Sequence, residues 1–147
     1  MPFQQHTQNG LVWFTADILN AIPHGFSTRL GGVSPAPWDS LNLRPNQGDG
    51  PEALRENYRR FFAVLGLDEN RAVLSQQTHT DHIRRVTEED AGKGVTRPRD
   101  YTDVDALITN VPNLPLTVFS ADCGTILLYD PVRQAVGAAH AGWRGCA

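Results

Sequence analysis

Residues 125–140 have the sequence TILLYDPVRQAVGAAH, which predicts a β-hairpin and sets the arrangement of its neighbours. Two β-prone apolar runs flank a turn that begins with Asp-Pro, a dipeptide that favours chain reversal. A turn centred in the PVRQ segment places Thr125 opposite His140, with Cys123 just beyond this pair. Because neighbouring strands lie about 5 Å apart, Cys123 and His140 can meet at the open end of the hairpin.

Short β-prone runs continue upstream of the hairpin, separated by Pro, Gly, Asn and Asp. They lie at residues 11–14, 24–28, 72–76, 82–86, 105–109 and 116–120. One helix is predicted from Pro51 to Gly66, because apolar side chains recur there at helical spacing and Pro and Gly mark its ends. The predicted fold class is therefore α/β (α+β), with layers of mixed β-sheet covered by helices.

Two longer segments connect these elements. Residues 29–50 form a polar loop rich in Gly and Pro, and loops of this length are either functional or ordinary surface excursions. Residues 88–103 are charged and poor in apolar residues, and we expect them to join two strands of one sheet. Neither flank has enough residues for a separate core, so residues 1–147 are expected to form a single domain.

The composition is that of a globular protein that acts on small molecules or other proteins. Apolar residues make up 40% and charged residues 20%, and the net charge of −3 favours neither nucleic acid nor an anionic membrane. The N-terminal residues lack the features of a signal peptide, so we expect a cytoplasmic location. The two cysteines are too few for a disulfide framework, and each is expected to be a free thiol or a ligand.

The turn between two predicted strands supplies further ligand candidates, His79 and His82. A set of one cysteine and two histidines leaves one position of a tetrahedral ion open, which is typical of catalytic zinc. Copper accepts the same donors. The alternatives are that Cys123 is a small buried apolar residue and that a histidine in a turn is simply solvated.

Other polar residues each have a functional and an ordinary interpretation. Asp122 is a candidate to orient a ligating histidine, or else it forms a turn. Arg29 and Arg144 are candidates to bind an anion such as phosphate, or else they are surface residues. We expect His24 and His82 to be structural or surface residues and His6 to lie in a tail.

Six segments, taken in order, resemble the YfiH-like laccase-domain proteins, which were first named polyphenol oxidases and later described as purine nucleoside phosphorylases. They are HGFSTRLGGVSPAPWDSLNL, GDGPEALRENYRRF, LSQQTH, DALIT, SADC and AAHAGWRG. The resemblance spans residues 24–145 and implies a compact α/β domain with a bound metal. Members of this family continue well beyond the last motif, so the resemblance implies that residues 1–147 form a single incomplete domain.

Carried over by motif, the resemblance assigns the metal ligands to His79, Cys123 and His140, which would also be the catalytic centre. It assigns contacts with substrate or phosphate to Arg29, Asn42 and Arg144. The chain departs from the family pattern at Thr80, where Gly is usual, and at the Gly-Thr pair after the cysteine. These changes bear on pocket shape and substrate preference more than on the ligands.

The implied activity is phosphorolysis of adenosine, inosine and guanosine by phosphate to give the base and ribose 1-phosphate, with adenosine deamination as a second activity. Zinc is the expected metal, with copper as the alternative. Two other functions stay open: a copper-dependent polyphenol oxidase, and a non-catalytic binding module. An exposed strand edge or apolar face is expected where the family has further structure, which favours an oligomer or a completing chain.

Overall fold

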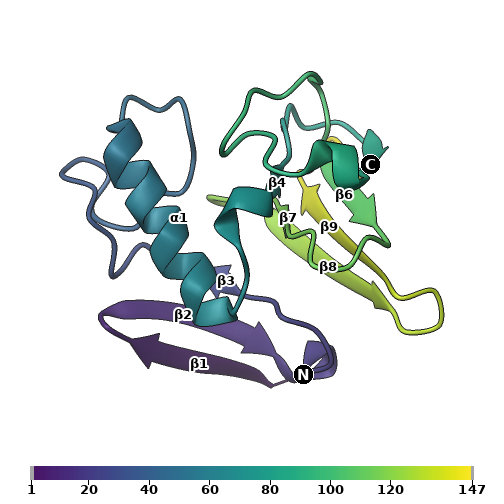
Figure 1. Cartoon of the computed structure of the whole chain (residues 1–147), viewed down its shortest axis with the longest axis horizontal. Helices are drawn as coiled ribbons and strands as arrows, with labels where there is room; N and C mark the ends of the chain where they lie inside the picture. Colours follow the sequence, from purple (N-terminus) through teal and green to yellow (C-terminus); the bar gives the residue numbers. More distant parts are fainter. Residues whose placement is uncertain (1, 147) are drawn as a thin grey trace. The chain divides into compact units, whose positions relative to one another are not determined.

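The computed structural model describes residues 2–146, which divide into an N-terminal unit ending at Glu69 and a C-terminal unit beginning at Asn70 (Figure 1). Each unit contains its own β-sheet structure, and the N-terminal unit also contains an α-helix. The predicted α+β class is therefore confirmed. No helix in the described part of the chain has the length and apolar character needed to cross a membrane.

The N-terminal unit begins with a three-stranded antiparallel sheet in the order β1-β2-β3. Its strands are β1 (Phe3–Gln8), β2 (Leu11–Ala16) and β3 (Phe26–Ser27). Asn9 and Gly10, with φ of 51° and 82°, form the tight turn between β1 and β2. The expectation that His6 lies in a tail is wrong, because it belongs to β1 and stacks on Trp13. Polar residues fill β1, so the sequence carries no apolar alternation that would predict this strand.

The predicted helix is α1 (Pro51–Leu65), with Pro at its start and Gly66 at its end in the left-handed conformation. It anchors the long loop of residues 29–50 through the fully buried side chain of Asn57. The Asn57 amide accepts a hydrogen bond from the Val33 N–H and donates to the Asn42 carbonyl. Tyr58 and Arg60 of the helix donate to further carbonyls of the loop, so polar side chains of the helix, rather than strands, hold it in place.

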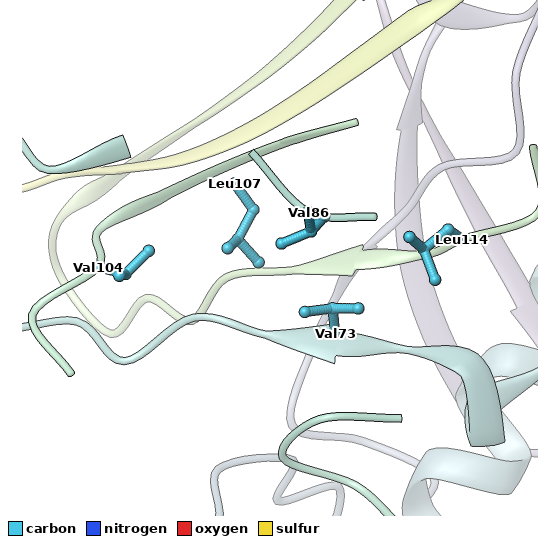
Figure 2. Packing of buried hydrophobic residues seen from close by; sticks show 5 residues of the cluster. All are labelled: Val73, Val86, Val104, Leu107 and Leu114. Carbon is cyan, nitrogen blue, oxygen red and sulfur yellow. The ribbon is translucent and has the colours of Figure 1, made fainter. Parts of the chain in front are cut away.

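The C-terminal unit contains a four-stranded mixed sheet in the order β5-β6-β9-β8 and a two-stranded parallel sheet, β4-β7. The strands are β4 (Val73–Leu74), β5 (Ile83–Arg85), β6 (Ala106–Thr109), β7 (Leu116–Thr117), β8 (Gly124–Asp130) and β9 (Ala135–Ala141). Short 3₁₀ helices lie at Asp17–Leu19, Glu69–Arg71 and Glu88–Asp90. Figure 2 shows the core of this unit, a cluster of Val73, Val86, Val104, Leu107 and Leu114.

The hairpin register agrees with its prediction. Strands β8 and β9 pair antiparallel with Thr125 opposite His140, and they form the long hairpin at the yellow end of the colour scale in Figure 1. The charged segment 88–103 connects β5 and β6, which pair in parallel within one sheet as expected. A parallel pair needs a crossover connection, which explains the length of this segment.

One face of the four-stranded sheet is apolar and exposed. Ile108 of β6 and Leu128 of β8 both pair with Gly137 of β9, so they lie on the same face, and they are 41% and 58% exposed. Ile126 is on this face too, because side chains two residues apart in a strand point the same way. Leu107 on the opposite face is fully buried. We call Ile108, Ile126 and Leu128 the apolar face below.

Candidate metal centre

Three metal-ligating side chains converge in the C-terminal unit. His79 lies in the connection between β4 and β5, Cys123 directly precedes β8, and His140 is in β9. One ligand atom from each residue lies within 4.8 Å of the others. The Cys123 Sγ is 3.9 Å from the His79 Nε2. We call these three residues the metal centre.

The hairpin register accounts for two of these positions. Gly124 pairs with Ala141, so Cys123 and His140 come together at the open end of the hairpin. Gly142 then passes close to both imidazoles: a Cβ atom there would lie 2.8 Å from the His79 Cδ2 and 3.2 Å from the His140 Cε1. A glycine at this point therefore leaves room for both rings beside the chain.

The third position depends on the buried carboxylate of Asp105. His79 has φ of 66°, in the left-handed region that a non-glycine residue rarely adopts. Its N–H donates to the Asp105 Oδ1 at 3.1 Å, and the Thr78 N–H donates to the Oδ2 at 2.8 Å. These two bonds hold the turn that presents the His79 side chain.

The same carboxylate orients the second imidazole. The His140 Nδ1–H donates to the Asp105 Oδ1 at 2.7 Å, and this bond leaves Nε2 as the ligand atom. The two histidine rings meet edge to face, with centroids 4.8 Å apart. The orienting carboxylate is thus Asp105 and not Asp122, the residue that the sequence offered as a candidate for this role. The available signal in the sequence was a charged residue at the start of the apolar run of residues 105–109.

Electrostatics keep Asp105 ionised. Burial acts to raise the pKa of its carboxyl group, but the Thr78 N–H, the His140 ring and the N–H groups of Thr80 and His79 outweigh burial and lower the pKa. Burial and then the charge of Asp122 raise the pKa of the Cys123 thiol above its ordinary value. The surroundings of Cys123 therefore favour the neutral thiol, and a bound cation would reverse this preference.

The donor set fits a zinc ion. Zinc prefers imidazole nitrogen and thiolate sulfur, with bonds of about 2.0–2.3 Å that separate tetrahedral ligand atoms by about 3.5 Å. The three ligand atoms lie within 4.8 Å of one another, with Cys123 Sγ 3.9 Å from His79 Nε2, so they would have to approach slightly to hold the ion. Three protein ligands would leave one position of a tetrahedral ion open.

The three residues expected to contact substrate or phosphate belong to two different units. One lies in the C-terminal unit with the metal ligands, and two lie in the N-terminal unit. Arg144 is exposed in the turn after β9, with its guanidinium 5.1 Å from the Trp143 ring centroid. Arg29 belongs to the N-terminal unit and pairs with Asp39 at 3.0 Å. Asn42 of the same unit donates to the Asp49 carboxylate at 2.9 Å.

Two other histidines have the ordinary roles expected of them. His24 is half-buried in the N-terminal unit, where its Nε2 accepts a hydrogen bond from the Ala16 N–H. His82 is exposed and lies 2.8 Å from the Asp103 carboxylate. Neither belongs to the group of ligands that converges in the described part of the chain.

Comparisons with known proteins identify a family that this chain matches. A family described as multi-copper polyphenol oxidoreductase laccase matches residues 23–147. Purine nucleoside phosphorylase YlmD of Bacillus subtilis is 37% identical over 125 residues, which are 82% of this chain and 44% of that protein. Purine nucleoside phosphorylase YfiH of Escherichia coli is 39% identical over 119 residues, 81% of this chain and 45% of that protein.

Solved structures show the same similarity. The crystal structure of the Bacillus licheniformis hypothetical protein YfiH matches with a TM-score of 0.87 and 35% identity, covering 98% of this chain and 53% of that chain. YlmD from Geobacillus stearothermophilus matches with a TM-score of 0.85 over a similar share of both chains. The chain spans about half the length of the relatives it matches.

Proposed function

The chain belongs to the multi-copper polyphenol oxidoreductase laccase family, and from this premise we propose that it is a metal-dependent purine nucleoside phosphorylase. Its substrates are purine nucleosides such as adenosine, inosine and guanosine, together with phosphate. The observation that carries the proposal is the convergence of His79, Cys123 and His140 in a chain whose relatives are named purine nucleoside phosphorylases. The reaction breaks the bond between C1′ and the base and forms ribose 1-phosphate.

We propose that His79, Cys123 and His140 hold zinc, with copper as the alternative. When bound, the ion supplies a positive charge and an open position at which an oxygen atom of water or substrate is polarised. Asp105 keeps the proton on His140 Nδ1, fixes the ring, and holds the backbone of the His79 turn. The carboxylate thus sets the geometry of two ligands at once.

Phosphorolysis also requires an anion to be held beside C1′ while negative charge builds on the departing base. We propose that Arg144 binds this phosphate, because its guanidinium is exposed four residues after His140. Arg29 and Asn42 are the further candidates for substrate contacts. Each has a carboxylate partner, Asp39 or Asp49, which it would exchange or share on binding.

Adenosine deamination is the second activity we propose for the same centre. It requires an activated water, and a metal with one open position lowers the pKa of bound water to about 7. The residues that hold the ion would be the same, so both activities should fail together when a ligand is removed. If a variant loses phosphorolysis but keeps deamination, the two activities do not depend on the same metal ligands.

The decisive experiment incubates inosine with phosphate and the protein, and measures hypoxanthine and ribose 1-phosphate by chromatography. We expect equal amounts of the two products from the native protein and neither from the Cys123→Ala variant. His82→Ala is the matched control, because this exposed histidine lies outside the ligand group. Equal turnover by the native and Cys123→Ala proteins would refute the proposal.

The family description also favours a second candidate, copper-dependent oxidation of phenols. Electron storage over several coppers needs many ligands, and the chain has two cysteines and five histidines in total. Metal analysis of protein purified without added copper, followed by a phenol oxidation assay, distinguishes the two functions. Stoichiometric nucleoside binding without product would instead support a binding module.

A further inference from the structure

The two edges of the four-stranded sheet differ in how they are protected from pairing with another chain. Proteins usually protect an edge strand by making it short or by placing charges on it. The edge strand β5 follows this rule, because it has three residues and two of them are arginines. The opposite edge strand, β8, has the seven residues GTILLYD, and its single charged residue, Asp130, lies at its end (Figure 1). Strand β8 is therefore a long apolar edge without this protection.

The backbone of β8 carries hydrogen-bonding groups that face away from the sheet. The His140 N–H donates to the Asp105 carbonyl at 2.8 Å, so at this position β9 turns its backbone groups away from β8. Thr125 pairs with His140, and its own N–H and C=O therefore point outward. This direction alternates along a strand, so the backbone groups of Leu127 and Tyr129 point outward too. Within residues 2–146, the strand pairs with β9 alone, and no backbone bond from elsewhere reaches these outward groups.

Apolar side chains are exposed on both faces of β8. Ile126 and Leu128 belong to the apolar face and are 46% and 58% exposed. Leu127 points to the opposite face, because side chains alternate along a strand, and it is still 37% exposed. A partner lying flat on the apolar face would leave Leu127 in water, whereas a strand added alongside β8 would contact side chains on both faces. The exposure pattern therefore favours pairing along the edge.

We propose that β8 pairs antiparallel with β8 of a second copy of this chain, about a two-fold axis at Leu127. In this register Leu127 faces Leu127 of the second copy, and Ile126 of each copy faces Leu128 of the other. Directly opposed residues lie on the same face of a sheet, so the two apolar faces join into one surface. Asp130, the only charged residue of the strand, faces Gly124 rather than another carboxylate.

The same register satisfies the outward backbone groups of β8. Leu127 pairs with its own counterpart, and Thr125 of each copy pairs with Tyr129 of the other. In an antiparallel pair of this kind, the two residues exchange both of their N–H···O=C bonds. The added strand would therefore bond all three of the residues whose backbone groups point away from β9.

Other registers oppose less suitable residues. An axis at Leu128 would place Ile126 opposite the charged Asp130. An axis at Ile126 would place Leu128 opposite Gly124, which has no side chain to pack. Because the apolar pattern sets the register, the sequence of β8 is best matched to itself about Leu127, and this self-complementarity is what identifies the occupant as a second copy.

A charge exchange at the axis tests the pairing. Leu127→Lys and Leu127→Asp are made in the full chain, and association is measured by sedimentation equilibrium at low salt. Each variant alone opposes like charges across the axis, so we expect its dimer dissociation constant to be at least about tenfold higher than that of the native dimer. In an equimolar mixture, the lysine of one variant lies opposite the aspartate of the other, and most of the lost affinity should return as a mixed dimer.

Ile83→Lys and Ile83→Asp are the matched controls, because Ile83 is exposed on β5 at the other edge of the same sheet. They should dimerise like the native protein, both alone and mixed. Circular dichroism checks that every variant folds. A native protein that stays monomeric at all concentrations would overturn the proposal, and so would a mixture of folded Leu127 variants that regains no affinity. A native dimer that resists both charges at Leu127 but is lost in Leu128→Lys would place the contact on the apolar face alone and would also overturn it.

Hydrogen exchange of the native protein provides a second test that needs no substitution. The amides of Thr125, Leu127 and Tyr129 should exchange at least about tenfold more slowly at concentrations where the dimer forms than in dilute solution, because only the dimer bonds them. The amides of Ile126 and Leu128 face β9 in both states and are the internal control. Unchanged exchange of the three outward amides on dimerisation would refute the edge pairing.

Discussion

Two clusters of polar side chains in the C-terminal unit differ in whether their charged and ligand atoms are paired with an opposite charge. In one, which we call the ion-pair cluster, Asp90 lies 2.8 Å from Arg84 and 2.7 Å from Lys93, and Lys93 also pairs with Asp100 at 2.9 Å. In the metal centre, one carboxylate serves two histidines, and the remaining nitrogen and sulfur atoms face one another without an opposite charge between them.

The pKa shifts express the same difference. Burial acts to raise the pKa of Asp90, but Lys93, Arg84 and the Thr87 N–H outweigh it and hold the pKa far below the ordinary value. The pKa of Cys123 is raised instead, first by burial and then by the charge of Asp122. A cluster whose charges cancel stabilises the fold, whereas donors that converge without a cation form a site for one.

Removal of a metal ligand should produce the largest effect. We expect Cys123→Ala and His140→Ala to lose stoichiometric zinc binding and to reduce phosphorolysis by more than about 100-fold, since loss of groups behind metal ligands alone costs about 10–100-fold. Zinc content by elemental analysis and product formation by chromatography provide the measurements. If either variant retains zinc and full turnover, the metal centre is not the functional cluster.

Substitution of the orienting carboxylate should have an intermediate effect. Asp105→Asn keeps the shape of the side chain but replaces the carboxylate that receives the His79 N–H and the His140 Nδ1–H. We expect zinc affinity to fall about 10–100-fold, measured by competition with a chelator. Asp100→Asn is the matched control, because this exposed carboxylate pairs with Lys93 and not with a residue of the metal centre, and it should change the affinity far less. Equal losses in both variants would remove the special role of Asp105.

The residues in these two predictions show which parts of the site could be predicted from the sequence and which could not. The pairing of Thr125 with His140 was predictable because a short turn sets the register of a hairpin locally. The position of His79 depends on a left-handed backbone and on a carboxylate 26 residues away, which no local pattern specifies. Asp105 was missed for the same reason, since its burial arises only when β6 enters the sheet. The family resemblance suggested Asn42 and favoured the anion-binding interpretation of Arg29 over the ordinary one, and the role of both residues stays a prediction.

The ion-pair cluster should respond in stability rather than in metal binding. Asp90→Asn leaves the Lys93 and Arg84 charges without their shared partner, and we expect a loss of about 3 kcal/mol in the free energy of unfolding. Urea denaturation measures this loss, and zinc affinity should stay at the native value. Asp100→Asn is the control: this carboxylate is exposed, and its loss should cost at most about 1 kcal/mol. A folded Asp90→Asn protein that has lost zinc binding would break the distinction between the clusters.

The stability difference between the native and Asp90→Asn proteins should depend on pH, and the pKa shift of Asp90 gives the direction of this dependence. The folded pKa of Asp90 lies below the ordinary value of 3.8, so the unfolded chain takes up the proton first as pH falls. The stabilisation is complete above about pH 5 and is lost as pH falls below about 4 toward the folded pKa. The stability difference between native and Asp90→Asn proteins, measured at pH 7, 5 and 3, should therefore shrink only at the lowest pH. A difference that is constant across this range would show that Asp90 does not act through its charge.

The smallest effect on stability should come from the apolar face, which contains no polar cluster. Leu128 is 58% exposed, so Leu128→Lys places its charge in water and should change the free energy of unfolding by less than about 0.5 kcal/mol. An exposed apolar face favours association, and the new charge opposes it. We therefore expect the native protein to self-associate more strongly than Leu128→Lys in sedimentation experiments, with zinc affinity equal in both. Identical sedimentation at every concentration would mean that this face does not mediate self-association, whereas reduced zinc affinity would link it to the metal centre on the opposite side of β9.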